Sequence, residues 1–168
     1  MRYLLFLLLL IVIVFLGPYC VFGQDLDGIC RITWQQENET REWCGVAISD
    51  TQVLSCGHHG VTGPVRLEFC VGRHGEPTRV SVPGVVYRSD VARDLSLIRY
   101  EAPAWAKVKV YRVGRLQGRA AIRGFLRGSC EVREGLPGRQ GGKVDGFEVV
   151  ELRVTCEQGL SGSPLVQD

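Results

Sequence analysis

Short apolar runs separated by turn-forming residues constrain the fold of this chain more than any other feature. No segment after residue 23 shows the sustained apolar period of 3.6 residues that an amphipathic helix produces. The runs are bounded instead by Gly, Pro, Asn or Asp, which is typical of strands and turns. We therefore predict an all-β protein, a barrel or a sandwich. The predicted strands lie at residues 45–48, 52–55, 65–71, 80–82, 85–87, 95–100, 108–113, 119–125, 132–133 and 147–155.

Three segments between these runs are predicted to lack regular structure. Residues 135–146 contain five glycines and a proline, so we expect a mobile loop there. Residues 83–84, a Pro-Gly pair, are expected to form a loop between two strands. Residues 102–104 read Ala-Pro-Ala and are the best candidate for the start of a linker.

The N-terminus has the pattern of an export signal. Arg2 precedes an uncharged apolar run over residues 4–16, and Gly17-Pro18 then ends any helix. We expect cleavage after Gly23, because small or branched residues occupy the positions that a signal peptidase recognises. The run is shorter than the roughly 20 residues of a membrane-spanning helix, but extended to Phe22 it could act as an uncleaved anchor. The sequence thus predicts a secreted or periplasmic protein that is free of the membrane after cleavage.

Export would place the cysteines in an oxidising compartment, where thiols pair. Cys20 is one of seven cysteines and would leave with the leader, so an even number remains and predicts disulfides. No Cys-x-x-Cys occurs, and the single local Cys/His cluster, residues 56–59, lacks a second ligand pair, so we expect no metal. The disulfide candidates are Cys30, Cys44, Cys56, Cys70, Cys130 and Cys156.

The charge pattern argues against nucleic acid as a partner. The chain has 20 lysines and arginines against 18 acidic residues, a net charge of +2 at pH 7. The arginines are scattered and form no basic block that would follow a phosphate backbone. Charged residues make up 23% of the chain, as in ordinary folded domains.

Three short segments hold residue types that together activate a serine. His58 follows an apolar run, Asp94 precedes another, and Ser161 lies between glycines. A serine hydroxyl becomes a strong nucleophile when a neutral imidazole takes its proton. A carboxylate must then hold the other ring nitrogen, and flanking glycines let backbone N–H groups converge on an oxyanion. Each segment alone is common, but the order His, Asp, Ser distinguishes among unrelated triad folds.

These segments resemble the motifs of the chymotrypsin/trypsin-like serine peptidases, and their short spacing resembles compact bacterial or Deg-type members. Residues 53–58, Val-Leu-Ser-Cys-Gly-His, are similar to the family's Val-Leu-Thr-Ala-Ala-His. Residues 94–97, Asp-Leu-Ser-Leu, are similar to Asp-Leu/Ile-Ala-Leu, and residues 159–164 to Gly-Asp-Ser-Gly-Gly-Pro. The resemblance covers about residues 28–168. It implies that Ser161 is the nucleophile, that His58 is the general base and acid, and that Asp94 is the orienting carboxylate. The backbone N–H groups of Gly159 and Ser161 would form the oxyanion hole. His59 is a rival base outside the motif register.

The resemblance also implies the architecture, two six-stranded Greek-key-type barrels. A signal peptide (1–23) would precede an N-terminal barrel (24–102) that contains His58 and Asp94. A linker (103–107) would lead to a C-terminal barrel (108–168) that contains Ser161. Family members continue by about 30 residues beyond the serine motif. We therefore expect the second barrel to be incomplete in this chain, as in a fragment.

Three residues depart from the family pattern. Leu160 replaces the acid that pairs with a new N-terminus, so we expect no activation by cleavage at that end. Ser163 replaces a glycine, which predicts strain if the position needs a positive φ. Cys56 precedes the histidine, and a Cys44–Cys56 bridge would clamp the hairpin beside it.

The function that follows is an exported serine endopeptidase without a cofactor, acting on proteins or peptides. One alternative is a secreted, non-catalytic β-domain of the same ancestry that binds peptides or proteins. Another is a disulfide-stapled adhesion or structural module, in which the order of the three motifs is coincidence. Cleavage specificity and oligomeric state have no signal in the sequence.

Overall fold

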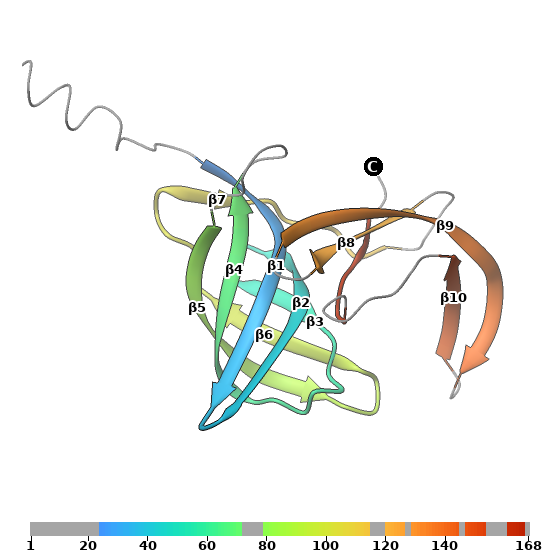
Figure 1. The fold of residues 1–168 in the computed structure, drawn as a ribbon, viewed down its shortest axis with the longest axis horizontal. Helices are drawn as coiled ribbons and strands as arrows, with labels where there is room; N and C mark the ends of the chain where they lie inside the picture. Colours follow the sequence, from blue (N-terminus) through green and yellow to red (C-terminus); the bar gives the residue numbers. More distant parts are fainter. Residues whose placement is uncertain are drawn as a thin grey trace, which may run out of the picture.

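The computed structural model describes residues 24–71, 79–114, 120–126, 129–144, 147–153 and 161–166, and every regular element in these ranges is a strand (Figure 1). This confirms the prediction of an all-β fold. The predicted signal peptide lies outside the described residues. Within the ranges described, no helix has the length and apolar character needed to cross a bilayer. The strands are β1 (Gln24–Gln36), β2 (Glu39–Ser49), β3 (Gln52–Ser55), β4 (Gly63–Val71), β5 (Arg79–Asp90), β6 (Leu95–Tyr100), β7 (Ala106–Val108), β8 (Ala120–Leu126), β9 (Ser129–Val144), β10 (Phe147–Arg153) and β11 (Leu165–Val166).

Strands β1 to β6 close into an antiparallel barrel. Their order is β2-β3-β6-β5-β4-β1, and pairing of β1 with β2 closes the ring. Residues 45–48 and 52–55, both predicted to be strands, lie in β2 and β3, which pair as a hairpin through Ser49 and Gln52 across a two-residue turn. β6 has the predicted bounds. β7 extends the sheet by pairing parallel to β1, with Ala106 opposite Gln24.

The predicted loop at Pro83-Gly84 is wrong, because β5 is one continuous strand. Inward and outward positions alternate through this pair, as in any half-buried strand. Pro83 is exposed, and Gly84 is buried. A Cβ on Gly84 would lie 3.1 Å from side-chain carbons of Leu67 and Ile98, so the glycine accommodates the core rather than a turn.

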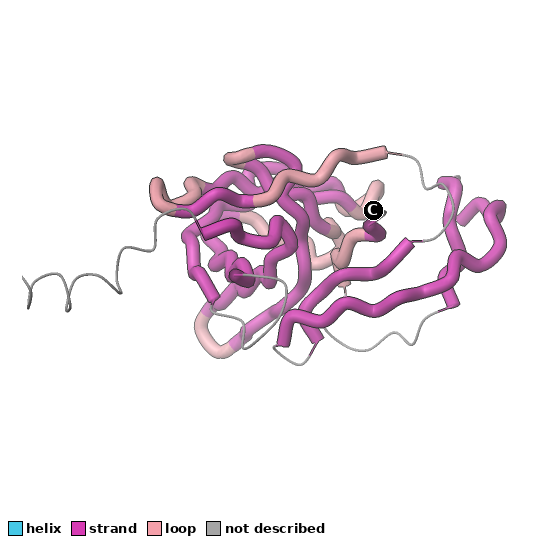
Figure 2. The backbone as a smooth tube through the Cα atoms, turned by 90° about the horizontal axis from the view of Figure 1, so that it is seen from above, coloured by secondary structure: helices cyan, strands magenta, loops and turns pink. Residues whose placement is uncertain are grey.

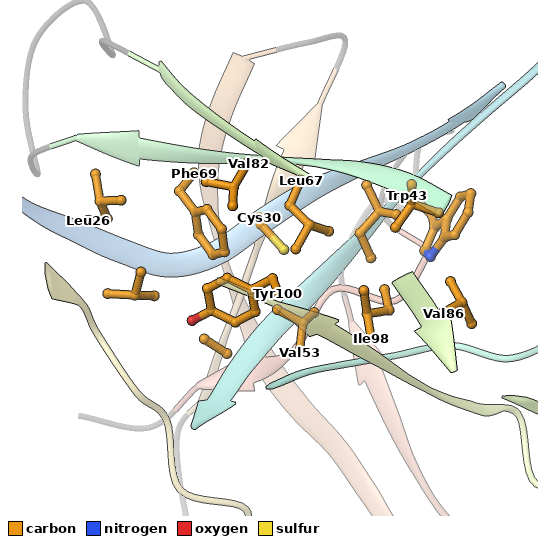
Figure 3. Close-up of a cluster of buried hydrophobic side chains, with 14 of the residues drawn as sticks. Leu26, Cys30, Trp43, Val53, Leu67, Phe69, Val82, Val86, Ile98 and Tyr100 are labelled. Carbon is orange, nitrogen blue, oxygen red and sulfur yellow. The ribbon is translucent and has the colours of Figure 1, made fainter. Parts of the chain in front are cut away.

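The barrel interior is a single apolar cluster (Figure 3). Trp43, Leu67 and Phe69 are almost fully buried in it, and the rings of Phe69 and Tyr100 lie 5.4 Å apart. The cluster receives side chains from every barrel strand, so the loops at the strand ends are held on a rigid support. The members labelled in Figure 3 are Leu26, Cys30, Trp43, Val53, Leu67, Phe69, Val82, Val86, Ile98 and Tyr100.

A second sheet lies beside the barrel (Figures 1 and 2). Its order is β10-β9-β8-β11, a partial second lobe of four strands within the described ranges. The loop predicted over residues 135–146 is wrong up to Val144, because β9 runs through it. The first part of β9 pairs with β8 and the rest pairs with β10, so backbone hydrogen bonding overrides the local preference of the glycines.

An apolar contact joins the two sheets. Phe125 of β8 is buried against Ile29, Cys44 and Val46 of the barrel. The backbone N–H of Phe125 donates to the Cys44 sulfur at 3.2 Å. Residues 109–114, where a strand was predicted from 108 to 113, have no regular structure. They cross the barrel surface, where the N–H of Tyr111 donates to the carbonyl of Ala47.

The predicted pairing of all six cysteines is wrong for three of them, since Cys30, Cys44 and Cys56 are thiols. The Cys44–Cys56 bridge is also wrong, for a geometric reason. Cys44 packs in the cluster that faces β8, whereas Cys56, just beyond the end of β3, packs in the barrel cluster, so their side chains belong to two different clusters. Cys70 is disulfide-bonded. The side chains of Cys130 and Cys156 lie outside the described part of the chain.

Candidate active site

The His58 loop begins where β3 ends and is pressed against the turn between β5 and β6. Gly57 makes this approach possible, because a Cβ there would lie 2.6 Å from the carbonyl oxygen of Leu95 and 2.9 Å from that of Asp90. Any side chain at this position would therefore push the loop away from the turn. The local sequence thus sets the distance between His58 and Asp94, the last residue of that turn.

Asp94 adopts a left-handed backbone conformation, with φ of 52°. Aspartate tolerates this region better than most residues do. One carboxylate oxygen, Oδ1, accepts three hydrogen bonds: from the N–H of Gly57 at 2.9 Å, from the N–H of His58 at 2.7 Å and from Nδ1 of His58 at 2.8 Å. The carboxylate therefore fixes both the loop backbone and the imidazole ring of His58.

The pKa of Asp94 is lowered from its ordinary value. Partial burial on its own raises this pKa. The hydrogen bonds from the backbone and ring of His58 and from the N–H of Gly57 together outweigh burial, because all of them favour the charged form. Asp94 is thus a carboxylate at neutral pH, as an orienting group for an imidazole has to be.

Ser161 reaches the same place from the far end of the chain. Its Oγ lies 2.9 Å from Nε2 of His58. Its carbonyl accepts a 2.7 Å hydrogen bond from the N–H of Cys44 on β2, which holds the serine turn on the barrel. The structure therefore brings together all three residues predicted for the triad. The side chains of His58 and Asp94 are about half exposed, at 50% and 55%.

Two further side chains lie at the serine hydroxyl. Nε2 of His59 is 3.4 Å from Ser161 Oγ, and Sγ of Cys56 is 3.3 Å from it. The ring of His59 lies against Trp43, with centroids 4.6 Å apart. Sequence reasoning assigned Cys56 to a disulfide and His59 to a lesser role. The signal in the sequence was that both lie within two residues of His58.

Both of these side chains favour the neutral form. Burial lowers the pKa of His59, and the neighbouring His58 and Arg41 lower it further. Burial raises the pKa of the Cys56 thiol by more than its hydrogen bonds to Ser161 and Ser55 lower it. His59 and Cys56 therefore place two neutral polar atoms beside Ser161 Oγ at neutral pH.

The other residues of the serine motif are Gly159, Gly162 and Ser163. Gly159, predicted to supply an oxyanion-hole N–H, lies outside the described residues, so that role stays a prediction. The strain expected at Ser163 is wrong, because the positive φ in this turn, 75°, belongs to Gly162. A Cβ on Gly162 would lie 2.2 Å from the carbonyl oxygen of Cys44. Both conformation and space therefore require glycine there.

We expect Gly162→Ala to displace Ser161 and reduce any activity of this site at least about 100-fold, since misplacement by about 1 Å has that effect. The matched control is Gly60→Ala, because Gly60 also has a positive φ, of 62°, but open space around its missing Cβ. The control isolates conformational strain of about 1–2 kcal/mol. Thermal unfolding and active-site labelling of both variants measure the two effects. Equal unfolding temperatures and equal labelling of the two variants would show that the close approach of Gly162 to Cys44 does not determine the position of Ser161.

Comparison with solved structures places this arrangement in a known architecture. Deg5 superposes with a TM-score of 0.62 at 14% identity over 83% of this chain and 73% of that one. The MamO protease domain from Magnetospirillum magneticum superposes with a TM-score of 0.60 at 17% identity over 83% of this chain and 77% of that one. The fold is that of the chymotrypsin-like serine proteases. Neither a protein-family model nor a curated protein sequence matches the chain.

The chymotrypsin-like fold extends to larger neighbours as well. The HtrA-type protease AlgW superposes with a TM-score of 0.62 at 16% identity, and the match covers 83% of this chain but 46% of that one. At these low identities, the superpositions show a shared fold. The triad geometry described above belongs to this chain's own residues and agrees with such a fold.

Proposed function

We propose that the protein is an exported serine endopeptidase that uses Ser161, His58 and Asp94 as a catalytic triad. One observation supports this most strongly: a continuous hydrogen-bonded path from Ser161 Oγ to His58 Nε2 at 2.9 Å, and from His58 Nδ1 to Asp94 at 2.8 Å. Proton transfer requires distances of this kind, about 2.6–3.2 Å between heavy atoms. The half-exposed position of the site would allow a peptide chain to reach it.

In the proposed reaction, Ser161 Oγ attacks the carbonyl carbon of a peptide bond while His58 Nε2 takes the hydroxyl proton. Asp94 stabilises the resulting imidazolium. His58 then gives this proton to the leaving amine, and an acyl-enzyme ester remains on Ser161. A water molecule, activated by His58, hydrolyses the ester and restores the free serine. The backbone N–H groups of Gly159 and Ser161 are proposed to stabilise the oxyanion in both halves of the reaction.

The proposal divides the work between two parts of the chain. The N-terminal barrel, residues 24–102, supplies the base and the orienting carboxylate, and residues 108–168 supply the nucleophile after a linker at 103–107. Proteins or peptides are the proposed substrates, as for the proteases with which the chain shares its fold. Export through residues 1–23 to a secreted or periplasmic location is proposed from the leader pattern.

A fluorophosphonate probe tests the proposal, because it reacts with serines that a neighbouring base has activated. We expect the purified full chain to be labelled, with the adduct mapped to Ser161 by mass spectrometry of peptides. Denatured protein and Ser161→Ala are the controls, and neither should be labelled. A folded, unlabelled chain would instead favour the non-catalytic, peptide-binding alternative.

A further inference from the structure

The hydroxyl of Ser161 is surrounded by three side-chain atoms that are common metal ligands. Nε2 of His58 lies 2.9 Å away, Nε2 of His59 lies 3.4 Å away, and Sγ of Cys56 lies 3.3 Å away. The ligand atoms of Cys56, His58 and His59 also lie within 4.8 Å of one another. A triad needs only one of these three side chains.

These separations are close to those of a tetrahedral zinc site. With Zn–N and Zn–O bonds of about 2.0–2.1 Å and a Zn–S bond of about 2.3 Å, adjacent ligand atoms lie about 3.3–3.6 Å apart. The three distances from Ser161 Oγ fall near this range. The ligand atoms of Cys56, His58 and His59 lie within 4.8 Å of one another, so side-chain shifts of about 1 Å would bring the remaining pairs into it. Two imidazoles and one thiolate are a donor set that favours Zn²⁺ over Mg²⁺ or Ca²⁺.

We propose that Zn²⁺ binds at this site, held by Cys56 Sγ, His58 Nε2 and His59 Nε2, with Ser161 Oγ or a water as the fourth ligand. Binding requires the Cys56 thiol to give its proton to solvent, while both imidazoles bind in their neutral form. The local cluster at residues 56–59 lacks a complete ligand set in the sequence. The fold supplies the fourth position through Ser161, which lies 105 residues beyond Cys56.

The surroundings of both histidines suit metal ligands. A metal-bound imidazole usually donates its other N–H to a carboxylate or a carbonyl, which fixes the ring. His58 already has this arrangement, because its Nδ1 contacts Asp94 at 2.8 Å. His59 is held in a different way: its ring lies against Trp43, and its backbone carbonyl accepts a 2.8 Å hydrogen bond from Arg41. Both rings are therefore already held in place before a metal binds.

The consequence is that zinc and catalysis exclude each other. Nε2 of a neutral imidazole has one lone pair, so His58 can either take the Ser161 proton or bind the metal. Zinc would therefore act as a reversible inhibitor that occupies the base and covers the nucleophile. This inhibitory part rests on the proposed function, whereas the binding of the metal does not.

Titration of the purified, metal-free full chain with cobalt(II) chloride tests the site without reference to activity. Cobalt substitutes for zinc and reports a bound thiolate through a charge-transfer band in the near ultraviolet. We expect this band at one cobalt per chain, its loss in Cys56→Ser, and an affinity at least about tenfold weaker in His59→Gln. His74→Gln, which removes the third of the chain's three histidines, is the matched control and should titrate like the wild type.

The wild-type titration can refute the proposal even if a variant fails to fold, and Cys56→Ser assigns the bound thiolate, because Cys30 and Cys44 are thiols as well. Absence of the thiolate band, or equal affinity in His59→Gln and His74→Gln, would overturn it. Zinc chloride should then block fluorophosphonate labelling of the wild type, and a chelator should restore it. If metal-free protein is not labelled at all, the proposed peptidase function fails, and the cobalt spectrum alone still judges the metal site.

Discussion

Replacing His58 by alanine is expected to lower the turnover of a peptide or ester substrate on the order of a millionfold, as for removal of a base that acts as one unit with its nucleophile. The structure gives the reason. Nε2 of His58 is the ring atom nearest to Ser161 Oγ, at 2.9 Å, and its ring is also the one in contact with Asp94. Without this imidazole, Ser161 has no oriented acceptor for its proton. Steady-state turnover of the purified variant measures the loss.

The neighbouring His59 allows a direct comparison of two candidate bases. His59 Nε2 lies 3.4 Å from the same hydroxyl, so a rival base is already present. Among the described contacts, no carboxylate orients its ring, and Trp43 holds it instead. We therefore expect His58→Gln to reduce turnover far more than His59→Gln does. The opposite ranking would reassign the base to His59 and break the proposed triad.

The fold was predictable where local pattern and tertiary pairing agree. β6 has its predicted bounds, 95–100, because an apolar run follows the Asp94 turn and ends before a proline-containing segment. β5 and β9 were mispredicted, because Pro83 and the glycines of residues 135–146 signal turns. In the structure, Pro83 pairs with β4 and residues 136–144 pair with β10, and the gain from ladder hydrogen bonds exceeds the local preference.

The candidate site was predictable only in part, for a similar reason. The order and flanking residues of the three motifs identified His58, Asp94 and Ser161. The environment of Cys56 could not be derived, since Cys56 lies just beyond the end of β3 and its neighbours, Ser161 among them, come from distant parts of the chain. The same applies to Gly162, whose missing side chain matters because the Cys44 carbonyl, on a distant strand, lies 2.2 Å from where a Cβ would be.

Replacing Asp94 by asparagine is expected to lower turnover about 10⁴-fold at neutral pH while leaving the fold intact. The amide oxygen can take the place of Oδ1 and still accept from the N–H groups of Gly57 and His58. It has no charge, however, to stabilise the imidazolium that forms when Ser161 loses its proton. If the amide group turns to donate to Nδ1, the remaining proton of the ring moves to Nε2, and His58 no longer accepts from the serine. Both orientations therefore reduce the rate.

The free energy of unfolding of the wild type should depend on pH through Asp94, and Asp94→Asn should lack this dependence. The pKa of Asp94 is lower in the folded chain, so protonation favours the unfolded state. The carboxylate thus stabilises the fold at a pH above about 3.9, the usual pKa of aspartate. This contribution is lost as the pH falls through the lower pKa that Asp94 has in the folded chain. The stability difference between wild type and Asp94→Asn, from urea unfolding at several pH values, should be present at pH 7 and vanish in acid.

The matched control for Asp94→Asn is Asp90→Asn, at the start of the same turn. Asp90 accepts from the N–H of Arg93 and pairs with the Arg93 side chain, and neither bond involves His58. Its amide would keep the backbone hydrogen bond, so turnover should fall by less than about tenfold, within what an indirect, exposed contact produces. A loss in Asp90→Asn as large as in Asp94→Asn would mean that the turn as a whole, and not the Asp94 carboxylate, determines the rate.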